Sequence, residues 1–274
     1  MIKFSLPLLA LTLSVSAAPT REAFALEERS ITGVSTEAFE LGDDNLTIEL
    51  WARSPMIFSP VAMDFDAQGR LWLTEGIDYQ RGLRTEGGRS IMVLEDKDWD
   101  GKADSSHVFV TDPDIRHAAL GIAVFDNQIV LSSTPSIIVY TDVNRNAVFD
   151  EGVDKREVFL TGFRDASHDH TLHAVVGAPS GQWHFSYGNR GADIKTKDGR
   201  HHISGCYYGY SDGIGKKSSD GEVYVGGMTM RVNPDGTGLT PTGENMRNSH
   251  DMFVSSYGDI YQSDNDDPAH ARIS

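Results

Sequence analysis

"PVAMDFDAQGRLWLTEG", residues 60–76, decides the fold: apolar residues alternate with small or polar ones, Gln68-Gly69 marks a turn, and the alternation resumes through Leu71 and Leu73. Two short runs of period two around a Gly-containing turn predict a β-hairpin. The pattern returns in residues 120–135, 172–189 and 246–266, with turns at positions 127, 181 and 258. Four copies therefore recur at intervals of roughly 55 to 75 residues, the period of a repeat architecture.

A second element follows the hairpins. Residues 90–110 and 136–160 both consist of an apolar run, an acidic turn and another apolar run, and residues 228–241 are a shorter version. Each repeat thus offers about four strands, which bury their faces only by stacking on neighbouring repeats. No stretch has helical periodicity. The expected fold is an all-β β-propeller, with a β-sandwich as the alternative.

The chain divides into three expected parts. Residues 1–17 carry one lysine, an apolar run and then small residues, the pattern of a secretory signal peptide. Residues 18–44 are polar and are expected to form a linker or N-terminal arm, and residues 45–274 the propeller. No later stretch reaches the length of about 18 apolar residues that a membrane span needs. The expected location is the periplasm or the exterior.

Charge and cysteine content exclude some functions. The chain has 40 acidic and 24 basic side chains and a formal net charge of −16. Such a charge repels phosphate backbones and argues against a nucleic-acid partner. Cys206 is the one cysteine, so the chain has neither an internal disulfide nor a CxxCH motif for covalent haem.

Two groups of polar residues precede hairpins. His168, His170 and His173 lie at the third hairpin, and Arg247-Asn248 precedes the fourth. In a propeller these positions face the central channel, so a histidine there could act as a general base or the three could bind a metal. Arg247 offers a fork of donors for carboxylate or quinone oxygens. Ordinary polar loops are the alternative.

Acidic loops are a third candidate site. Residues 96–104 follow the pattern D-x-D-x-D-G-x-x-D, and residues 142–150 are a degraded copy. Alternate oxygen ligands with a glycine at the bend suit calcium, although the closing Glu of an EF-hand is missing. The alternative is a hairpin turn in which Asp and Asn bind their own backbone. The candidate calcium ligands here are Asp96, Asp98, Asp100 and Asp104.

Four segments together carry a family resemblance: "SPVAMDFDAQGRLWLTEGIDY", "DWDGKADSSHVF", "HTLHAVVGAPSGQWHFSYGN" and "RNSHDMFVSSYGDIYQSDND". With them the chain resembles the quinoprotein glucose and sorbosone dehydrogenases, and more narrowly the membrane-bound dehydrogenase proteins of planctomycetes, whose N-terminal domain is such a propeller. The matching segments cover most of residues 46–268.

The resemblance implies a six-bladed propeller that binds pyrroloquinoline quinone (PQQ) and calcium and oxidises a sugar or alcohol hydroxyl. His170 falls at the histidine that acts as general base in the family, although Thr171, Leu172 and His173 replace the residues that follow it there. Arg247 and Asn248 match the family's cofactor contact, and His173 is expected to contact the cofactor with them. Residues 263–268 correspond to the segment that supplies calcium ligands, which points to Asn265 and Asp266.

The resemblance also leaves questions of completeness and partner. About four to five blades are expected where the family has six, so the propeller is expected to be incomplete. Electrons would leave to a separate acceptor such as a cytochrome c, because the chain has no haem motif. The alternatives are a non-catalytic propeller that binds carbohydrate or protein, an inactive fragment, and a hydrolase with a metal on His168, His170 and acidic residues.

Overall fold

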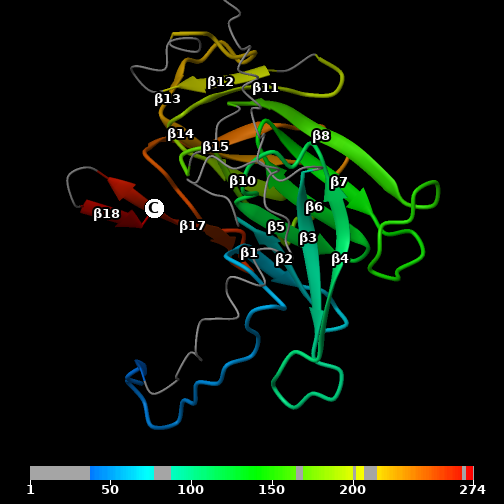
Figure 1. Ribbon diagram of the computed structural model, residues 1–274. Helices are drawn as coiled ribbons and strands as arrows, with labels where there is room; N and C mark the ends of the chain where they lie inside the picture. The colour runs from blue at the N-terminus through cyan, green and yellow to red at the C-terminus, as the bar shows by residue number, and fades with distance from the viewer. Residues whose placement is uncertain are drawn as a thin grey trace, which may run out of the picture.

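The computed structural model describes residues 38–76, 88–164, 169–199, 202–206, 215–266 and 270–273 (Figure 1). The expected signal peptide and residues 18–37 of the expected linker lie outside this part. Residues 38–44 are exposed and form no strand. The described residues form an all-β fold, and none of them lies in a helix that is long and apolar enough to cross a membrane.

Three four-stranded antiparallel blades form the body of the fold. Blade 1 contains β1 (Pro60–Phe65), β2 (Leu71–Glu75), β3 (Arg89–Glu95) and β4 (Ser105–Asp112). Blade 2 contains β5 (Gly121–Phe125), β6 (Gln128–Ser133), β7 (Ser136–Thr141) and β8 (Lys155–Phe163). Blade 3 contains β9 (Leu172–Gly177), β10 (Trp183–Tyr187), β14 (Gly227–Val232) and β15 (Thr240–Met246).

A fourth sheet starts the next blade. It contains β16 (Met252–Val254), β17 (Ile260–Asp266) and β18 (His270–Ile273). All four predicted hairpins are confirmed as the first two strands of a blade. Gly69, Gly181 and Gly258 have φ values of 79°, 81° and 89° in their turns, a region that is open to glycine and strained for most other residues. The regular recurrence of these turns therefore reflects a backbone requirement.

An insertion interrupts blade 3. Strands β11 (Ala192–Lys195), β12 (His202–Cys206) and β13 (Tyr224–Val225) come between β10 and β14. They extend the sheet of blade 2, because β11 pairs with β8. The sequence predicted about four to five blades, and the described residues include three complete blades and three strands of a fourth. The chain between the third and fourth hairpins enlarges an existing sheet and adds no blade.

The first strands of the blades run side by side in one direction. A Cβ at Gly121, where β5 starts, would lie 2.6 Å from the carbonyl oxygen of His173 near the start of β9. A Cβ at Gly177, where β9 ends, would lie 2.9 Å from the Phe125 ring at the end of β5. The hairpin turns therefore lie at one end of the propeller, which we call the turn end. The loops that lead into β5, β9 and β16 lie at the other end, which we call the strand-start end.

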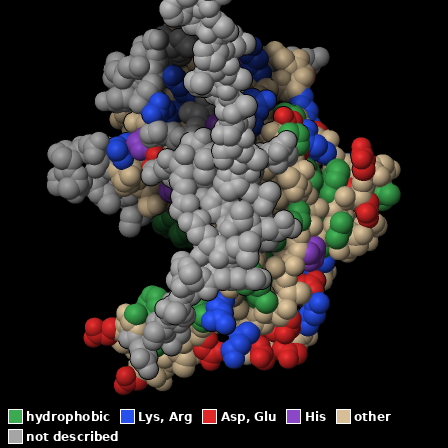
Figure 2. Space-filling view, in the orientation of Figure 1, with side chains coloured by type: hydrophobic (Ala, Val, Ile, Leu, Met, Phe, Trp, Pro, Cys, Tyr) green, Lys and Arg blue, Asp and Glu red, His purple; other side chains and the backbone are tan. Residues whose placement is uncertain are grey.

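The turn end also carries the acidic loops. Trp99, in the β3–β4 loop, lies against Gly69 in the β1–β2 turn, and Arg145, in the β7–β8 loop, forms a salt bridge to Asp126 in the β5–β6 turn. Figure 2 shows many Asp and Glu side chains at its lower end, beneath the position of β3 and β4 in Figure 1.

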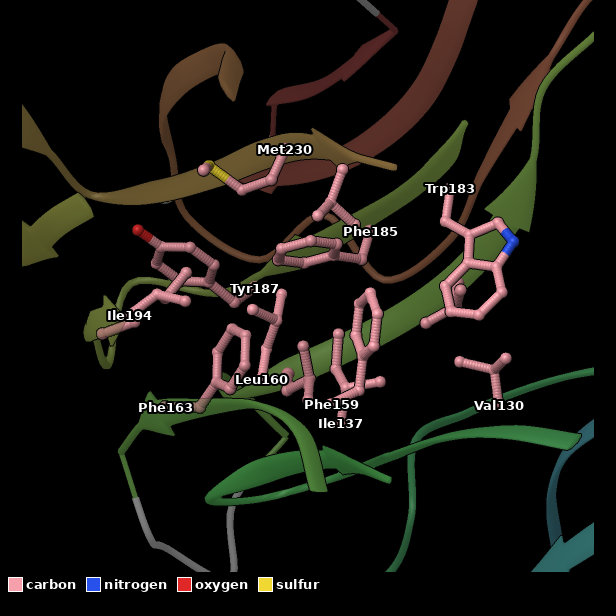
Figure 3. Packing of buried hydrophobic residues seen from close by; sticks show 14 of the residues in the cluster. Val130, Ile137, Phe159, Leu160, Phe163, Trp183, Phe185, Tyr187, Ile194 and Met230 are labelled. Atoms are coloured by element: carbon pink, nitrogen blue, oxygen red, sulfur yellow. The ribbon is translucent and has the colours of Figure 1, made fainter. Parts of the chain in front are cut away.

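Apolar side chains between neighbouring blades form the core. Trp72, Phe109 and Tyr140 are among the buried residues that join blades 1 and 2. Between blades 2 and 3, Phe159 and Phe163 pack against Trp183, Phe185 and Tyr187, as Figure 3 shows. Burial of such aromatic residues contributes about 1.5–3 kcal/mol each. Blade 2 thus buries both of its faces against neighbouring blades, as the repeat pattern predicted.

Blade 1 has a second covered face. Leu71, Leu73, Met92 and Leu94 point away from blade 2 and pack against the segment before β1, which supplies Trp51, Ala52, Met56 and Ile57. Leu46 and Ile48, earlier in this segment, are exposed. The expected start of the propeller at residue 45 therefore corresponds to an irregular segment that covers a sheet face, and the first strand starts at Pro60.

Candidate functional site

His170 lies at the strand-start end, two residues before β9. Its backbone is held by a hydrogen bond from Arg190 N to His170 O of 3.2 Å. Its Nδ1 lies 2.8 Å from Asn189 Oδ1. Because an amide oxygen only accepts hydrogen bonds, Nδ1 carries the proton and Nε2 is the basic nitrogen. The ring is half-buried, so the geometry favours the tautomer that a general base needs.

Arg247 and Asn248 lie beside His170, in the loop between β15 and β16. Asn189 N donates to Arg247 O over 2.8 Å, so one residue contacts both predicted groups. The fit is close: a Cβ at Gly188 would lie 2.6 Å from Asn248 Oδ1 and 2.8 Å from the Cα of His170. The structure therefore brings together three of the predicted residues, one from blade 3 and two from the start of blade 4.

His173 is completely buried at the start of β9. Its Nε2 lies 2.6 Å from Asn248 Oδ1, and its ring centroid lies 4.7 Å from that of His250. Burial, followed by the nearby His250, lowers the pKa of His173 to about 4. The ring is therefore neutral at pH 7, with the proton on Nε2. In this environment His173 supports Asn248, and its direct contact with a cofactor stays a prediction.

The predicted calcium ligands of residues 263–268 follow the alternation of β17. Asp264 is 4% exposed, and its carboxylate accepts hydrogen bonds from the backbone N–H groups of Arg247 and Asn248 over 3.1 and 2.7 Å. Asn265 is exposed on the other side of the strand. The side chain of Asp266 lies outside the described residues, as does His168. A calcium role for Asn265 and Asp266 stays a prediction.

The acidic loop of residues 96–104 is a separate feature at the turn end. Carboxylate oxygens of Asp96, Asp98 and Asp104 lie within 4.8 Å of one another. Asp100 instead accepts a hydrogen bond from Lys102 N over 2.9 Å. Three oxygen donors in this arrangement fit a hard cation such as calcium. The same carboxylates bind backbone N–H groups, for example Asp96 that of Gly101 over 2.9 Å, which is the alternative that the sequence left open.

The carboxylates of the second acidic loop, residues 142–150, are also occupied by hydrogen bonds within the loop. Asp142 accepts from the N–H groups of Asn146 and Ala147, and Asp150 accepts from the side chains of Asn144 and Asn146.

Within the described residues, the loop of residues 96–104 provides the three-residue grouping of possible metal ligands. The structure therefore gives no support to a metal held by the described histidines.

An apolar hollow of about 680 Å³ lies along the first strands of the blades. Residues of β1, β5 and β9 line it, and His250, Asp251 and Met252 line it from the fourth blade. His250 thus connects the hollow to the buried His173. The position corresponds to the central channel that the propeller pattern predicted.

Sequence reasoning missed Asn189 and Asp264. Asn189 follows Tyr187 and Gly188 at the end of β10, in a segment that contributes to the family resemblance. Asp264 belongs to a run of polar residues from Gln262 to Asp266. Strand alternation from the buried Gln262 would have assigned Asp264 to the inner face.

The family model described as a domain of unknown function, DUF7133, matches residues 33–273. The chain belongs to the DUF7133 family. A comparison with curated proteins found no match.

Solved structures that resemble this DUF7133 chain are propeller enzymes. The PQQ-bound aldose sugar dehydrogenase from Streptomyces coelicolor has a TM-score of 0.52 at 14% identity, over 79% of this chain and 59% of that one. The iodide structure of the Trichoderma reesei carbohydrate-active enzyme of family AA12 has a TM-score of 0.50 at 14% identity, over 79% and 47%. The calcium structure of the same enzyme has 0.50 at 13%, with the same coverage. The chain thus spans about half the length of these proteins, and at such identities the similarity shows the propeller fold alone.

Proposed function

We propose that this chain is part of an exported PQQ-dependent dehydrogenase that oxidises a sugar or alcohol hydroxyl. The observation that carries the proposal is the junction of blades 3 and 4, where Asn189 holds both His170 and the backbone of Arg247. The family resemblance of the sequence and the likeness in fold to a PQQ-bound sugar dehydrogenase support it. The periplasmic or secreted location rests on the expected signal peptide.

His170 is the proposed general base. Its Nδ1–H donates to Asn189 Oδ1, so Nε2 is the nitrogen that would take the proton of a substrate hydroxyl. His173 is unsuited to this task because it is completely buried and its Nε2–H is used by Asn248. The two histidines therefore have different proposed roles: His170 moves a proton, and His173 supports Asn248.

Arg247 and Asn248 are the proposed cofactor contacts. Because His173 occupies Asn248 Oδ1, the amide N–H groups of Asn248 are the donors that remain for a ligand. A guanidinium and an amide donor suit the quinone and carboxylate oxygens of PQQ. When bound, PQQ supplies the two-electron acceptor that takes a hydride from the carbon of the substrate hydroxyl.

Calcium is part of the proposal at two places. The carboxylates of Asp96, Asp98 and Asp104 fit a cation at the turn end, where it would brace a loop away from the chemistry. Asn265 and Asp266 are the residues that the resemblance assigns to calcium near the cofactor. Electrons would pass to a separate acceptor such as a cytochrome c.

The test is calorimetric titration of the purified chain with PQQ, with and without calcium. Arg247→Ala is expected to weaken PQQ binding about 10- to 100-fold, whereas His170→Ala is expected to retain binding and lose dye-linked sugar oxidation. Arg145→Ala is the control, because it removes an arginine that pairs with Asp126 at the turn end.

Three outcomes would count against parts of the proposal. If the folded wild-type chain binds no PQQ, the dehydrogenase assignment fails for this chain, and a non-catalytic propeller that binds carbohydrate or protein becomes the better interpretation. If His170→Ala keeps wild-type oxidation, the general base is another residue. If Arg145→Ala weakens binding as much as Arg247→Ala, the arginine effect is one of stability and gives no support to a cofactor contact.

A further inference from the structure

Asp264 is a buried carboxylate whose task lies in its contacts with main-chain amides. Oδ1 accepts from Asn248 N over 2.7 Å and Oδ2 accepts from Arg247 N over 3.1 Å. The side chain is 4% exposed. Hydrogen bonds to an ionised acceptor are shorter and about twice as strong as neutral ones. Both peptide N–H groups of the Arg-Asn pair are therefore fixed by one side chain from the neighbouring strand β17.

The contacts continue from Asp264 to the other site residues. Asn248 Oδ1 lies 2.6 Å from His173 Nε2, and Arg247 O accepts from Asn189 N over 2.8 Å. Asn189 in turn holds His170. A displacement of the Arg247-Asn248 backbone would therefore change the orientation of the His170 and His173 rings.

Blade 1 contains the same device at the equivalent position. Glu75 and Asp264 both lie six residues after the positive-φ glycine of their hairpin turns, Gly69 and Gly258. Glu75 Oε1 accepts from Phe58 N, in the segment before β1, over 2.8 Å. The carboxylate therefore has a structural use in this fold, and a glutamate is long enough to serve it.

We infer that Asp264 is a positioning residue, which holds Arg247 and Asn248 so that their side chains face a bound anionic ligand. The inference rests on the proposed function for the identity of that ligand. The holding of the dipeptide itself is a property of the chain and can be measured without PQQ.

The test compares Asp264→Asn, Asp264→Glu and the control Asp66→Asn. Asp66 is a buried carboxylate at the turn end that accepts from Gln68 N, Arg70 N and Trp72 Nε1. Asp264→Asn is expected to weaken PQQ binding about 10- to 100-fold, and Asp264→Glu to restore most of it. Asp66→Asn is expected to lower the urea midpoint and leave PQQ binding unchanged.

A second measurement is the NMR signal of the His173 Nε2 proton, which reports its hydrogen bond to Asn248. Asp264→Asn is expected to shift or broaden it, and Asp66→Asn to leave it in place. In the wild-type chain, the amides of Arg247 and Asn248 are expected to exchange with deuterium as slowly as those of β17. Amide exchange is measured on the wild-type chain, so it tests whether the Arg247 and Asn248 amides are held even if Asp264→Asn does not fold.

Unchanged PQQ binding and an unchanged His173 signal in folded Asp264→Asn would overturn the inference, as would rapid exchange of the two amides. Equal weakening by Asp66→Asn would also overturn it. If the wild type binds no PQQ while the His173 signal and the exchange behave as expected, the proposed function fails and the positioning role of Asp264 stands.

Discussion

Substitution of Tyr140 by Phe tests how blades 1 and 2 are joined. The Tyr140 hydroxyl is completely buried and donates to Asp112 Oδ2 over 2.5 Å. Asp112 also accepts from Arg156 Nε and Asp114 N. Burial and the neighbouring Asp112 raise the pKa of Tyr140, so its hydroxyl stays a donor over the accessible pH range.

The expected loss follows from the type of bond. A hydrogen bond to a charged group contributes about 1.5–3 kcal/mol, and Phe keeps the packing of the ring. Since 1 kcal/mol shifts the melting temperature of a domain of this size by about 2–4 °C, Tyr140→Phe is expected to melt about 3–12 °C lower. Urea unfolding at pH 7, followed by tryptophan fluorescence, measures the free energy directly.

Acid gives a second signature of the same bond. Burial alone would raise the pKa of Asp112, but hydrogen bonds from Arg156, Tyr140 and Asp114 N outweigh it and lower the pKa. The stabilisation is therefore complete above the ordinary value of 3.8 and is lost as pH falls through the lowered one. The difference between Tyr140→Phe and wild type should shrink in that acid range.

Tyr224→Phe is the control, because it removes a tyrosine bond to the exposed Asp220. It is expected to cost about 0.5 kcal/mol or less. If Tyr140→Phe costs no more than this control at pH 7, the buried bond does not stabilise the junction of the blades, and the predicted effect is refuted.

Three further predictions concern the site and the acidic loop. His173→Gln should flatten the fall of unfolding free energy between pH 6.5 and 4 in urea titrations, because the folded pKa of about 4 lets only the unfolded chain bind this proton there; an unchanged slope would refute the lowered pKa. Gly188→Ala should cost about 1–3 kcal/mol by overpacking and weaken PQQ binding, whereas Gly42→Ala, with nothing within 4 Å of the new Cβ, should change neither. Calcium at about 100 times its dissociation constant should stabilise the chain by about 2.7 kcal/mol and change the fluorescence of the exposed Trp99; Asp98→Asn should remove both effects, and their persistence would place calcium elsewhere.

The sequence predicted the hairpins well because their signals are local. Alternation of apolar residues and a glycine with positive φ lie within about a dozen residues of each other, so no distant contact is needed to recognise them. The insertion could not be predicted in the same way. Its attachment depends on pairing between Ala192 in β11 and Phe163 in β8. Strands β9 and β10 of blade 3 lie between these two segments in the sequence, and no local pattern indicates that they pair.

The site was predicted in part for the same reason. His170, Arg247 and Asn248 precede hairpins, and the repeat placed them at one end of the propeller. The roles of His173 and Asp264 depend on burial, which comes from contacts between β9, β16 and β17. Composition alone also could not separate the acidic loop of Asp96 from the residues of the channel, whereas the structure places them at opposite ends.

The insertion has a mechanical consequence. Because the chain leaves blade 3 after β10, adds β11–β13 to the sheet of blade 2 and returns as β14, backbone hydrogen bonds cross-link two neighbouring blades. Blade 2 cannot swing away from blade 3 without straining the chain links to this β-ladder, whereas within the described residues no strand of blade 3 pairs with one of blade 4. The junction of blades 3 and 4, where the site lies, therefore depends on loop and side-chain contacts in place of a shared sheet, such as Asn189 N to Arg247 O and Asp264 to the N–H groups of Arg247 and Asn248.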